Sequence, residues 1–221
     1  MPEPRIYDTQ ESCPVARTLN VVGDRWTILV LRELSWGRKR YSRLLEALEG
    51  RNAPIVGIEP SCLLTLRDEL GVVMKDDRTK PVTARSVLFE EFLAAEARRG
   101  QLRLPFRKDG KQQAYLHGHC HQKALGTMPD VVSALQLVPG LSVKTIESSC
   151  CGMAGAFGYE KDHYEVSMRM AERSLLPAVR GAPGDALIVA DGTSCRHQIE
   201  DGAGRRAMHV ACVLQSALET R

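Results

Sequence analysis

Four short apolar segments, separated by helical stretches, constrain the fold of this 221-residue chain more than any other feature. The apolar segments are residues 54–58, 114–118, 142–146 and 186–191. Helical periodicity is found over residues 61–70, 81–99, 129–137, 161–180 and 205–218. Short apolar runs suit strands that are buried on both faces. Their alternation with helices predicts an α/β domain, in which helices cover both faces of a parallel sheet.

A cysteine follows each predicted strand by two to four residues. These cysteines are Cys62, Cys120, Cys150 and Cys195. Because the carboxyl ends of parallel strands lie at one edge of a sheet, we expect the thiols to meet there. Helix N-termini at that edge stabilise thiolates and an anionic metal–sulfur cluster.

The adjacent pair Cys150 and Cys151 favours a metal or redox role over burial in the core. A lone cysteine after a strand is most often a small buried hydrophobic residue, but two neighbouring side chains cannot both point into one core. Gly152 and Gly155 let the following loop wrap closely around an ion. We therefore predict metal or redox ligands at Cys120, Cys150, Cys151 and Cys195, with Cys62 as a further candidate.

The cysteine pattern also limits which metal is expected. Seven cysteines, an odd number, and no visible export signal argue against a disulfide framework, so the thiols should stay reduced. Soft thiolates select zinc or an iron–sulfur cluster. Zinc sites usually use closely spaced CxxC pairs, which this chain lacks, so ligands from four strand ends favour the larger cluster and leave zinc as the alternative. Cys212 lies mid-helix on an apolar face and is expected to pack in the core.

Three histidines, His117, His119 and His121, alternate around Cys120. If this segment stays extended, they share the face opposite the thiol and supply a ligand, a proton relay or hydrogen bonds to a cluster. His197, close to the last cysteine of the set, has the same options. For each of them, a polar loop at the start of a helix is an equally good interpretation.

Residues 1–43 differ in charge from the rest of the chain. They carry eight Lys or Arg and five Asp or Glu, whereas the remaining residues carry 22 of each, which suggests that two unlike pieces are joined. Short helices are predicted over residues 15–22, 25–36 and 42–48. With the basic residues Arg38, Lys39 and Arg40, they suit the front half of a helix-turn-helix, but no recognition helix or wing follows.

The composition excludes several classes of protein. Hydrophobic residues make up 43% of the chain and charged residues 26%, as in ordinary globular proteins. No apolar run approaches the ~18 residues that a membrane span needs, and no signal or transit segment is visible. We therefore expect a cytoplasmic protein without a membrane span, and not a collagen-like, disordered, integral-membrane or secreted one.

Four motifs carry a resemblance to a known family: GIEPSCLLTLRDEL (57–70), HGHCHQKALG (117–126), ESSCCGMAGAFGYEKDHYEVSMRMAE (147–172) and IVADGTSCRHQI (188–199). In this order they resemble the CCG, or cysteine-rich, domain of heterodisulfide reductase catalytic subunits. The most similar members are the C-terminal modules of FAD-linked oxidases and of D-lactate or glycolate dehydrogenase iron–sulfur proteins. The resemblance covers about three quarters of the chain, from about Pro54 onward.

In that family the pattern of Cys, Cys-Cys-Gly and CxxC occurs twice. The resemblance maps the second copy onto Cys120, Cys150, Cys151, Gly152 and Cys195. Gln198 stands where the last cysteine would be, and Cys62 is all that remains of the first copy. The resemblance implies half of a pseudo-symmetric α/β unit that holds a [4Fe-4S] cluster, while the lost cysteine puts the family's non-cubane form of the cluster in doubt.

Residues 11–44, ESCPVARTLNVVGDRWTILVLRELSWGRKRYSRL, resemble the opening of an HxlR-type winged-helix transcription regulator. Cys13 matches the cysteine that some members use to sense oxidants, although an unremarkable exposed thiol explains it equally well. In this interpretation Arg38, Lys39 and Arg40 contact phosphates, and otherwise they are simply solvated. Because the recognition helix and wing are missing, base-specific reading of DNA is not supported.

These features together predict a truncated HxlR-like segment at 1–43 and a CCG-type iron–sulfur domain at 54–221. The expected function is an iron–sulfur electron-transfer module of an FAD-linked 2-hydroxy-acid (D-lactate or glycolate) dehydrogenase, incomplete and not catalytic alone, with FAD held by a partner or parent protein. Expected partners are a flavin or iron–sulfur oxidoreductase subunit or the missing CCG half, with a homodimer or DNA as further candidates. A redox-responsive DNA-binding regulator is the alternative function, and a structural remnant that binds neither metal nor DNA is the third.

Overall fold

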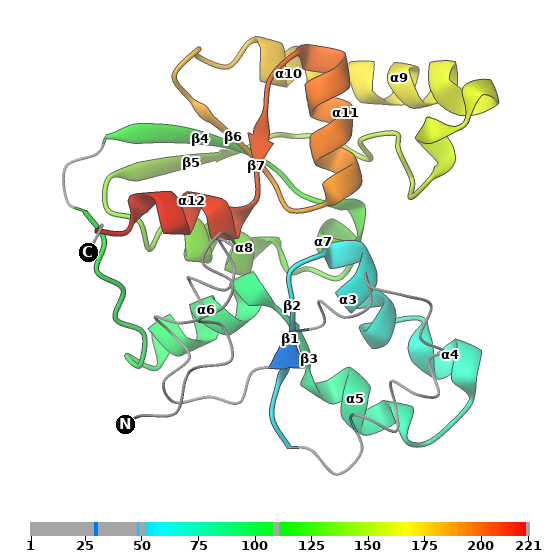
Figure 1. The fold of residues 1–221 in the computed structure, drawn as a ribbon, viewed down its shortest axis with the longest axis vertical. Coiled ribbons are helices and arrows are strands. Elements are labelled where there is room, and N and C mark those ends of the chain that lie inside the picture. The colour runs from blue at the N-terminus through cyan, green and yellow to red at the C-terminus, as the bar shows by residue number, and fades with distance from the viewer. Residues whose placement is uncertain (1–28, 31–47, 49–51, 108–110, 220–221) are drawn as a thin grey trace, which may run out of the picture.

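The computed structural model describes residues 29–30, 48, 52–107 and 111–219 of the chain, and these form two parallel sheets (Figure 1). The first sheet has the order β1-β2-β3 and consists of β1 (Leu29–Val30), β2 (Ile55–Gly57) and β3 (Ser86–Leu88). The second sheet has the order β5-β4-β6-β7 and consists of β4 (Gln112–His117), β5 (Leu141–Thr145), β6 (Leu187–Ala190) and β7 (Ala207–Met208). Neighbouring strands in both sheets pair in parallel, which confirms the predicted α/β class and all four predicted strands.

The connections between the strands are mostly helical. After β2 come α3 (Pro60–Arg67), α4 (Leu70–Met74) and α5 (Thr79–Arg85), and after β3 comes α6 (Phe89–Arg98). The second sheet is connected by α7 (Cys120–Ala124), α8 (Met128–Leu135), α9 (Tyr164–Glu172), α10 (Leu175–Arg180), α11 (Thr193–Ala203) and α12 (Val210–Ala217). Two short 3-10 turns, η3 (Phe157–Tyr159) and η4 (Lys161–His163), precede α9. None of the described helices is long and apolar enough to cross a membrane.

Helices cover both faces of the second sheet (Figure 1). Because successive strand residues point to opposite faces, Leu116 of β4 and Val189 of β6 lie in one core with α6, α8 and α12. Tyr115 and Ile188, on the other face, contact a second core that includes residues of α10 and α11. By the same alternation, His117 at the end of β4 lies on the α11 face.

The first sheet has a smaller core of its own. Leu48 and buried residues of β2, β3 and helices α3 to α5 form it; the latter are Ile55, Leu63, Leu64, Leu66, Leu70, Val82 and Leu88. Val56 of β2 and Phe89 of α6 instead join the core under the second sheet. Residues from both sheets therefore pack in one core, and Glu59, after β2, is hydrogen-bonded to Thr193, after β6.

The structure corrects several helix predictions. Within the helix predicted over 25–36, the two described residues form β1 at the edge of β2, since a short apolar run suits a strand as well as a helix. The helix predicted over 81–99 is interrupted by β3, whose backbone pairs with β2. The helix predicted over 161–180 is divided among η4, α9 and α10, and Pro177 lacks the N–H that a continuous helix needs.

The remaining differences concern short elements. Residues 205–218 begin with β7 before α12 starts, and helices α4, α7 and α11 were not among those predicted. Leu48 is helical and buried, in line with the helix predicted over 42–48. The rest of the predicted HxlR-like segment, including Cys13, Arg38, Lys39 and Arg40, lies outside the described residues, and its helices stay a prediction.

Candidate metal centre

Three neighbouring strands deliver the four predicted thiols to one edge of the second sheet. Cys120 begins α7 directly after β4, and Cys195 lies in the first turn of α11 after β6. Cys150 and Cys151 lie in the loop that follows β5. Since β5, β4 and β6 are adjacent and parallel, all three connections start from the same end of the sheet.

The four thiols form a continuous chain of contacts. The Sγ atoms of Cys151 and Cys195 are 3.4 Å apart, and both residues are buried. Cys150 lies beside both Cys151 and Cys120, and its thiol interacts with theirs. The chain runs from the exposed Cys120 through Cys150 and Cys151 to the buried Cys195, which is the convergence that a shared ligand requires.

Contacts among the four thiols shift their pKa values in opposite directions. The interaction with Cys120, followed by that with Cys151, holds the pKa of Cys150 far below its ordinary value. The backbone N–H of Gly152 also donates to the Cys150 sulfur at 3.3 Å. The hydrogen bond between Cys195 and Cys151 lowers the pKa of Cys195 to about 5. The contacts among the thiols, together with burial, raise the pKa of Cys120 and Cys151.

His117 adds a buried nitrogen to the thiol chain. Its side-chain ligand atom and the sulfurs of Cys151 and Cys195 all lie within 4.8 Å of one another. The ring Nδ1 is hydrogen-bonded to Ser148 Oγ at 2.8 Å, whereas Nε2 has no hydrogen-bond partner among the described residues, although the residue is only 1% exposed. An unpaired buried polar atom costs about 1–3 kcal/mol, so this nitrogen is the kind of atom that a bound metal or cluster would satisfy.

Two glycines keep space free around the thiols. A Cβ at Gly192 would lie 2.6 Å from a ring carbon of His119 and 3.2 Å from the Cys195 sulfur. Gly152 has a positive φ of 95°, and a Cβ there would lie 2.2 Å from the backbone oxygen of Ser167. The chain therefore passes close to the thiol chain at two points where only glycine fits.

The residues present fit an iron–sulfur cluster or zinc better than a hard cation. Four sulfur atoms and one imidazole nitrogen form a soft donor set, and such donors select iron–sulfur clusters or zinc. The low pKa values of Cys150 and Cys195 supply the thiolate form that binds metal. Gln198, at the position of the family's second cysteine, is buried and donates to the backbone oxygen and the hydroxyl of Ser167.

The other predicted histidines occupy different surroundings. Because α7 begins at Cys120, the segment does not stay extended. His119 is buried, caps α7 by accepting from the backbone N–H of His121, and has its Nδ1 3.9 Å from the Cys120 sulfur. His121 instead approaches Glu69, with Nε2 3.6 Å from Oε1. His197 is exposed and hydrogen-bonds Tyr159 on the outer side of α11.

Cys62 and Cys212 lie apart from this group. Cys62 is exposed on α3, a helix that contacts α7, and its thiol interacts with Glu59 and Ser61 instead of with the four cysteines. Cys212 is half-buried on α12, in the helix where the sequence placed it. The structure thus brings together four of the five predicted cofactor cysteines, and their role as ligands stays a prediction.

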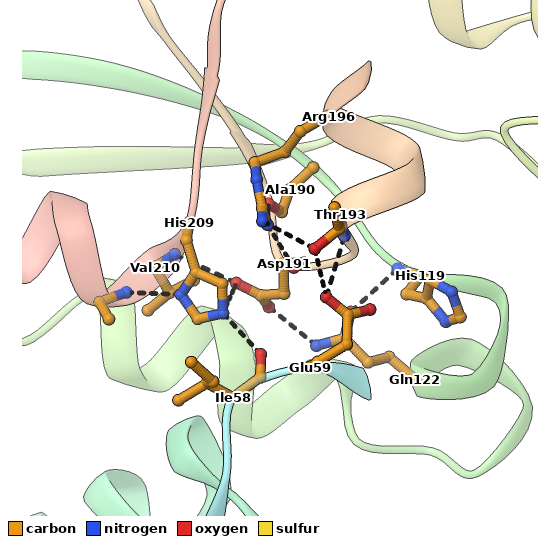
Figure 2. Close-up of polar contacts among 11 residues, drawn as sticks. Ile58, Glu59, His119, Gln122, Ala190, Asp191, Thr193, Arg196, His209 and Val210 are labelled. Atoms are coloured by element: carbon orange, nitrogen blue, oxygen red, sulfur yellow. Dashed lines mark hydrogen bonds and ion pairs between the residues drawn. The ribbon is translucent and has the colours of Figure 1, made fainter. Parts of the chain in front are cut away.

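A polar network behind the thiols joins the two sheets (Figure 2). Glu59, after β2, accepts hydrogen bonds from the backbone N–H and hydroxyl of Thr193 at 3.0 and 2.8 Å. His209 donates from Nε2 to the backbone oxygen of Ile58 at 2.7 Å. Asp191, after β6, accepts from the backbone N–H of Val210 at 3.1 Å. These contacts fix the start of α11, and with it Cys195.

A further link in the network reaches the Cys120 segment (Figure 2). Gln122 donates to Asp191 Oδ2 at 2.8 Å, and its own oxygen accepts from the backbone N–H of His119 at 2.9 Å. Sequence reasoning missed this network and gave His117 no separate role. For His117, the signal was its position within β4, since odd-numbered residues of that strand face α11.

Comparisons with known proteins agree with the cysteine pattern. Residues 114–200 match the family of CCG cysteine-rich domains. The chain is 28% identical over 173 residues to a subunit of the anaerobic glycerol-3-phosphate dehydrogenase of Escherichia coli, covering 78% of this chain and 42% of that protein. It is also 28% identical over 172 residues to the D-2-hydroxyglutarate dehydrogenase of Escherichia coli, covering 77% of this chain and 16% of that protein.

A different similarity covers a shorter stretch. An uncharacterized HTH-type transcriptional regulator of Synechocystis is 41% identical over 44 residues, which is 20% of this chain and 33% of that protein. No solved structure matches the chain significantly. The chain thus spans less than half the length of the dehydrogenase relatives it matches. Residues 114–200 are a cysteine-rich domain of the CCG type, as the motifs in the sequence indicate.

Proposed function

We propose that this chain binds an iron–sulfur cluster and relays single electrons within a larger dehydrogenase-type oxidoreductase. The proposed ligands are Cys120, Cys150, Cys151 and Cys195. The observation that carries the proposal is the contact between the buried Cys151 and Cys195 thiols beside the imidazole nitrogen of His117, which has no hydrogen-bond partner among the described residues, with Cys150 and Cys120 next to this group. The similarity of the CCG domain to a subunit and a part of two dehydrogenases supports it.

Each residue at the site has a task in this proposal. When bound, the cluster, for which we propose the [4Fe-4S] form, supplies a centre that accepts and releases single electrons. The backbone N–H of Gly152 stabilises a ligating thiolate, and Ser148 orients His117 so that its other nitrogen faces the centre. Cys195 is buried whereas Cys120 is exposed, so electrons enter and leave on the Cys120 side.

The remaining chemistry is assigned to a partner, because the chain spans at most 42% of its dehydrogenase relatives. In this proposal a flavin subunit oxidises a 2-hydroxy acid such as D-lactate or glycolate. FAD bound by that subunit would supply the electrons that the site relays. Cys62 would serve as an additional ligand when a partner completes the site, and His119, whose Nδ1 is 3.9 Å from the Cys120 sulfur, would tune the centre.

Zinc is a second candidate, favoured by one distance. Tetrahedral coordination with Zn–S bonds of about 2.3 Å places sulfur atoms about 3.8 Å apart, and the Cys151 and Cys195 sulfurs are 3.4 Å apart. A structural zinc ion would leave the protein colourless, whereas an iron–sulfur cluster absorbs visible light. The metal content of the protein distinguishes the two.

A DNA-binding regulator is a second candidate function, because 44 residues resemble an HTH-type regulator. In this proposal Arg38, Lys39 and Arg40 contact phosphates, and Cys13 responds to oxidants. Binding through phosphates falls steeply with salt. An electrophoretic shift of promoter DNA that disappears at higher salt would support this function, and no shift at low salt would reject it.

The proposed electron relay is tested by anaerobic reconstitution with iron and sulfide. We expect a brown protein that retains iron after desalting, and loss of that iron in the double variant Cys150→Ser/Cys151→Ser. The matched control Cys212→Ser should keep its iron, because Cys212 lies on α12. A colourless wild-type protein without iron, or equal loss in the control, would contradict the assignment.

A further inference from the structure

Lys123 lies near the thiols and is hydrogen-bonded to the loop that precedes Cys150, a contact that the cysteine pattern did not predict. Its Nζ donates to the backbone oxygens of Ser148 and Ser149 at 2.6 and 2.7 Å, and lies 3.4 Å from Ser148 Oγ. These two residues directly precede Cys150, and Lys123 lies three residues after Cys120. The side chain therefore links the helix that carries one thiol to the loop that carries two others.

The stem of Lys123 is confined as well as its ammonium group. A Cβ at Gly118 would lie 3.2 Å from Lys123 Cε and 2.3 Å from the sulfur of Met128. The lysine stem thus lies against a backbone position that has no side chain. A half-buried lysine with three hydrogen-bond acceptors loses much of its side-chain freedom, so its charge stays in one place.

The charge of Lys123 acts on the whole thiol set. Burial lowers the pKa of Lys123, while the negative charge of the cysteine thiolates, that of Cys195 first, opposes this shift. Among the described residues, no carboxylate lies within ion-pair distance of its ammonium group. The nearest negative charge that it can offset is therefore that of the thiolates.

We propose that Lys123 is a positioning residue of the metal centre: it fixes the Cys150 loop against α7 and offsets the negative charge of the sulfur ligands. This inference rests on the proposed function. A fixed positive charge beside a cluster favours the reduced, more negative state, so Lys123 raises the reduction potential. Partners outside the ligand set commonly change metal affinity 10- to 100-fold, and we expect a loss of that order when the tether is removed.

Three variants of the full chain separate the tether from the charge. Lys123→Met removes both, Lys123→Gln keeps an N–H donor without charge, and Lys123→Arg keeps the charge. Lys80→Met is the control, because Lys80 is an exposed lysine paired with Asp77 on another part of the fold. Circular dichroism verifies folding, and iron retention against a chelator and the midpoint potential of the reconstituted cluster are then measured for each protein.

We expect about 10- to 100-fold weaker iron retention for Lys123→Met, a more negative potential for both neutral variants, and values near wild type for Lys123→Arg and Lys80→Met. If Lys123→Met does not fold, the comparison of Lys123→Gln with Lys123→Arg still tests the charge. Weaker retention with an unchanged potential would make Lys123 a purely structural residue and overturn the proposal, as would unchanged values in all variants. A wild-type protein that binds no cluster would instead refute the proposed function itself.

Discussion

Glu90 in the first turn of α6 offers the sharpest test of the electrostatics inside the fold. It is fully buried, and neither carboxylate oxygen has a hydrogen-bond partner among the described residues. Its carboxylate lies within 4.8 Å of ligand atoms of Asp191 and His209. Burial, and then the charge of Asp191, raise the pKa of Glu90 well above its ordinary value.

Two neighbours of Glu90 already have other hydrogen-bond partners. Asp191 accepts two hydrogen bonds, from Gln122 and from a backbone N–H. His209 accepts a backbone hydrogen bond at Nδ1 and donates from Nε2 to a backbone oxygen. The acidic side chains of Glu91 and Glu59 raise the pKa of Glu90 further. Glu90 therefore holds a proton in the folded protein.

The consequence is a stability that falls as the pH rises. An unfolded glutamate releases its proton near pH 4.3, at about the ordinary value for this side chain. Between that value and the raised folded pKa, the unfolded state binds one proton fewer than the folded state. The free energy of unfolding then falls by about 1.4 kcal/mol per pH unit within this range. The contribution of Glu90 is fully present below about pH 4.3 and is lost as the pH passes the folded pKa.

The substitution Glu90→Gln removes this slope. Urea unfolding of wild type and variant between about pH 4.5 and 7.5 measures the difference in free energy of unfolding. A buried glutamine with unpaired polar atoms costs about 1–3 kcal/mol at every pH, so the slope of the difference, not its offset, is the readout. The exposed Glu200→Gln on α11 is the control and should give a flat difference. Parallel profiles for Glu90→Gln and wild type would refute the reasoning.

Three further substitutions or treatments test other contacts. Glu59→Ala removes two hydrogen bonds and a negative charge from the start of α11. It should lower the free energy of unfolding in urea titrations by about 1–2 kcal/mol. No change would contradict a role of Glu59 in joining the two sheets. Gly152→Ala should lower the free energy of unfolding by about 3 kcal/mol, because its Cβ would lie 2.2 Å from a backbone oxygen. Gly155 also has a positive φ but has free space around it, so Gly155→Ala should lower that free energy by about 1 kcal/mol. Thermal unfolding measures both. In metal-free protein, a mild oxidant should form a disulfide between Cys151 and Cys195 first, because their sulfurs are 3.4 Å apart and the pKa of Cys195 is about 5. Peptide mapping that finds another disulfide first would contradict this.

The sequence was sufficient to predict the meeting of the thiols but not the contacts that hold them. Cys120, Cys151 and Cys195 come together because each follows a parallel strand, and that relation can be read from spacing. The hydrogen bonds of Lys123 and Glu59 depend on which loops lie side by side, and spacing along the chain does not contain that information. Long-range polar contacts were therefore missed even where the fold class was confirmed.

The short strands β1 and β3 were not predicted from the sequence for a different reason. The three residues of β3 lie within a helical pattern, and only pairing with β2 makes them a strand. The same holds for β1 in the predicted helix 25–36. An apolar run of two or three residues has no periodicity that separates the two states. Pairing with a neighbouring strand therefore decides whether such a segment forms a strand or a helix, and the local sequence pattern does not.

The central claim, that sulfur ligands from separate loops hold one iron–sulfur centre, is tested most directly by iron K-edge X-ray absorption of protein purified without oxygen. We predict iron surrounded by sulfur, a second iron atom at the short distance that marks a cluster, and inorganic sulfide in the same sample. Iron surrounded by oxygen and nitrogen, or protein that contains no iron at all, would contradict the account.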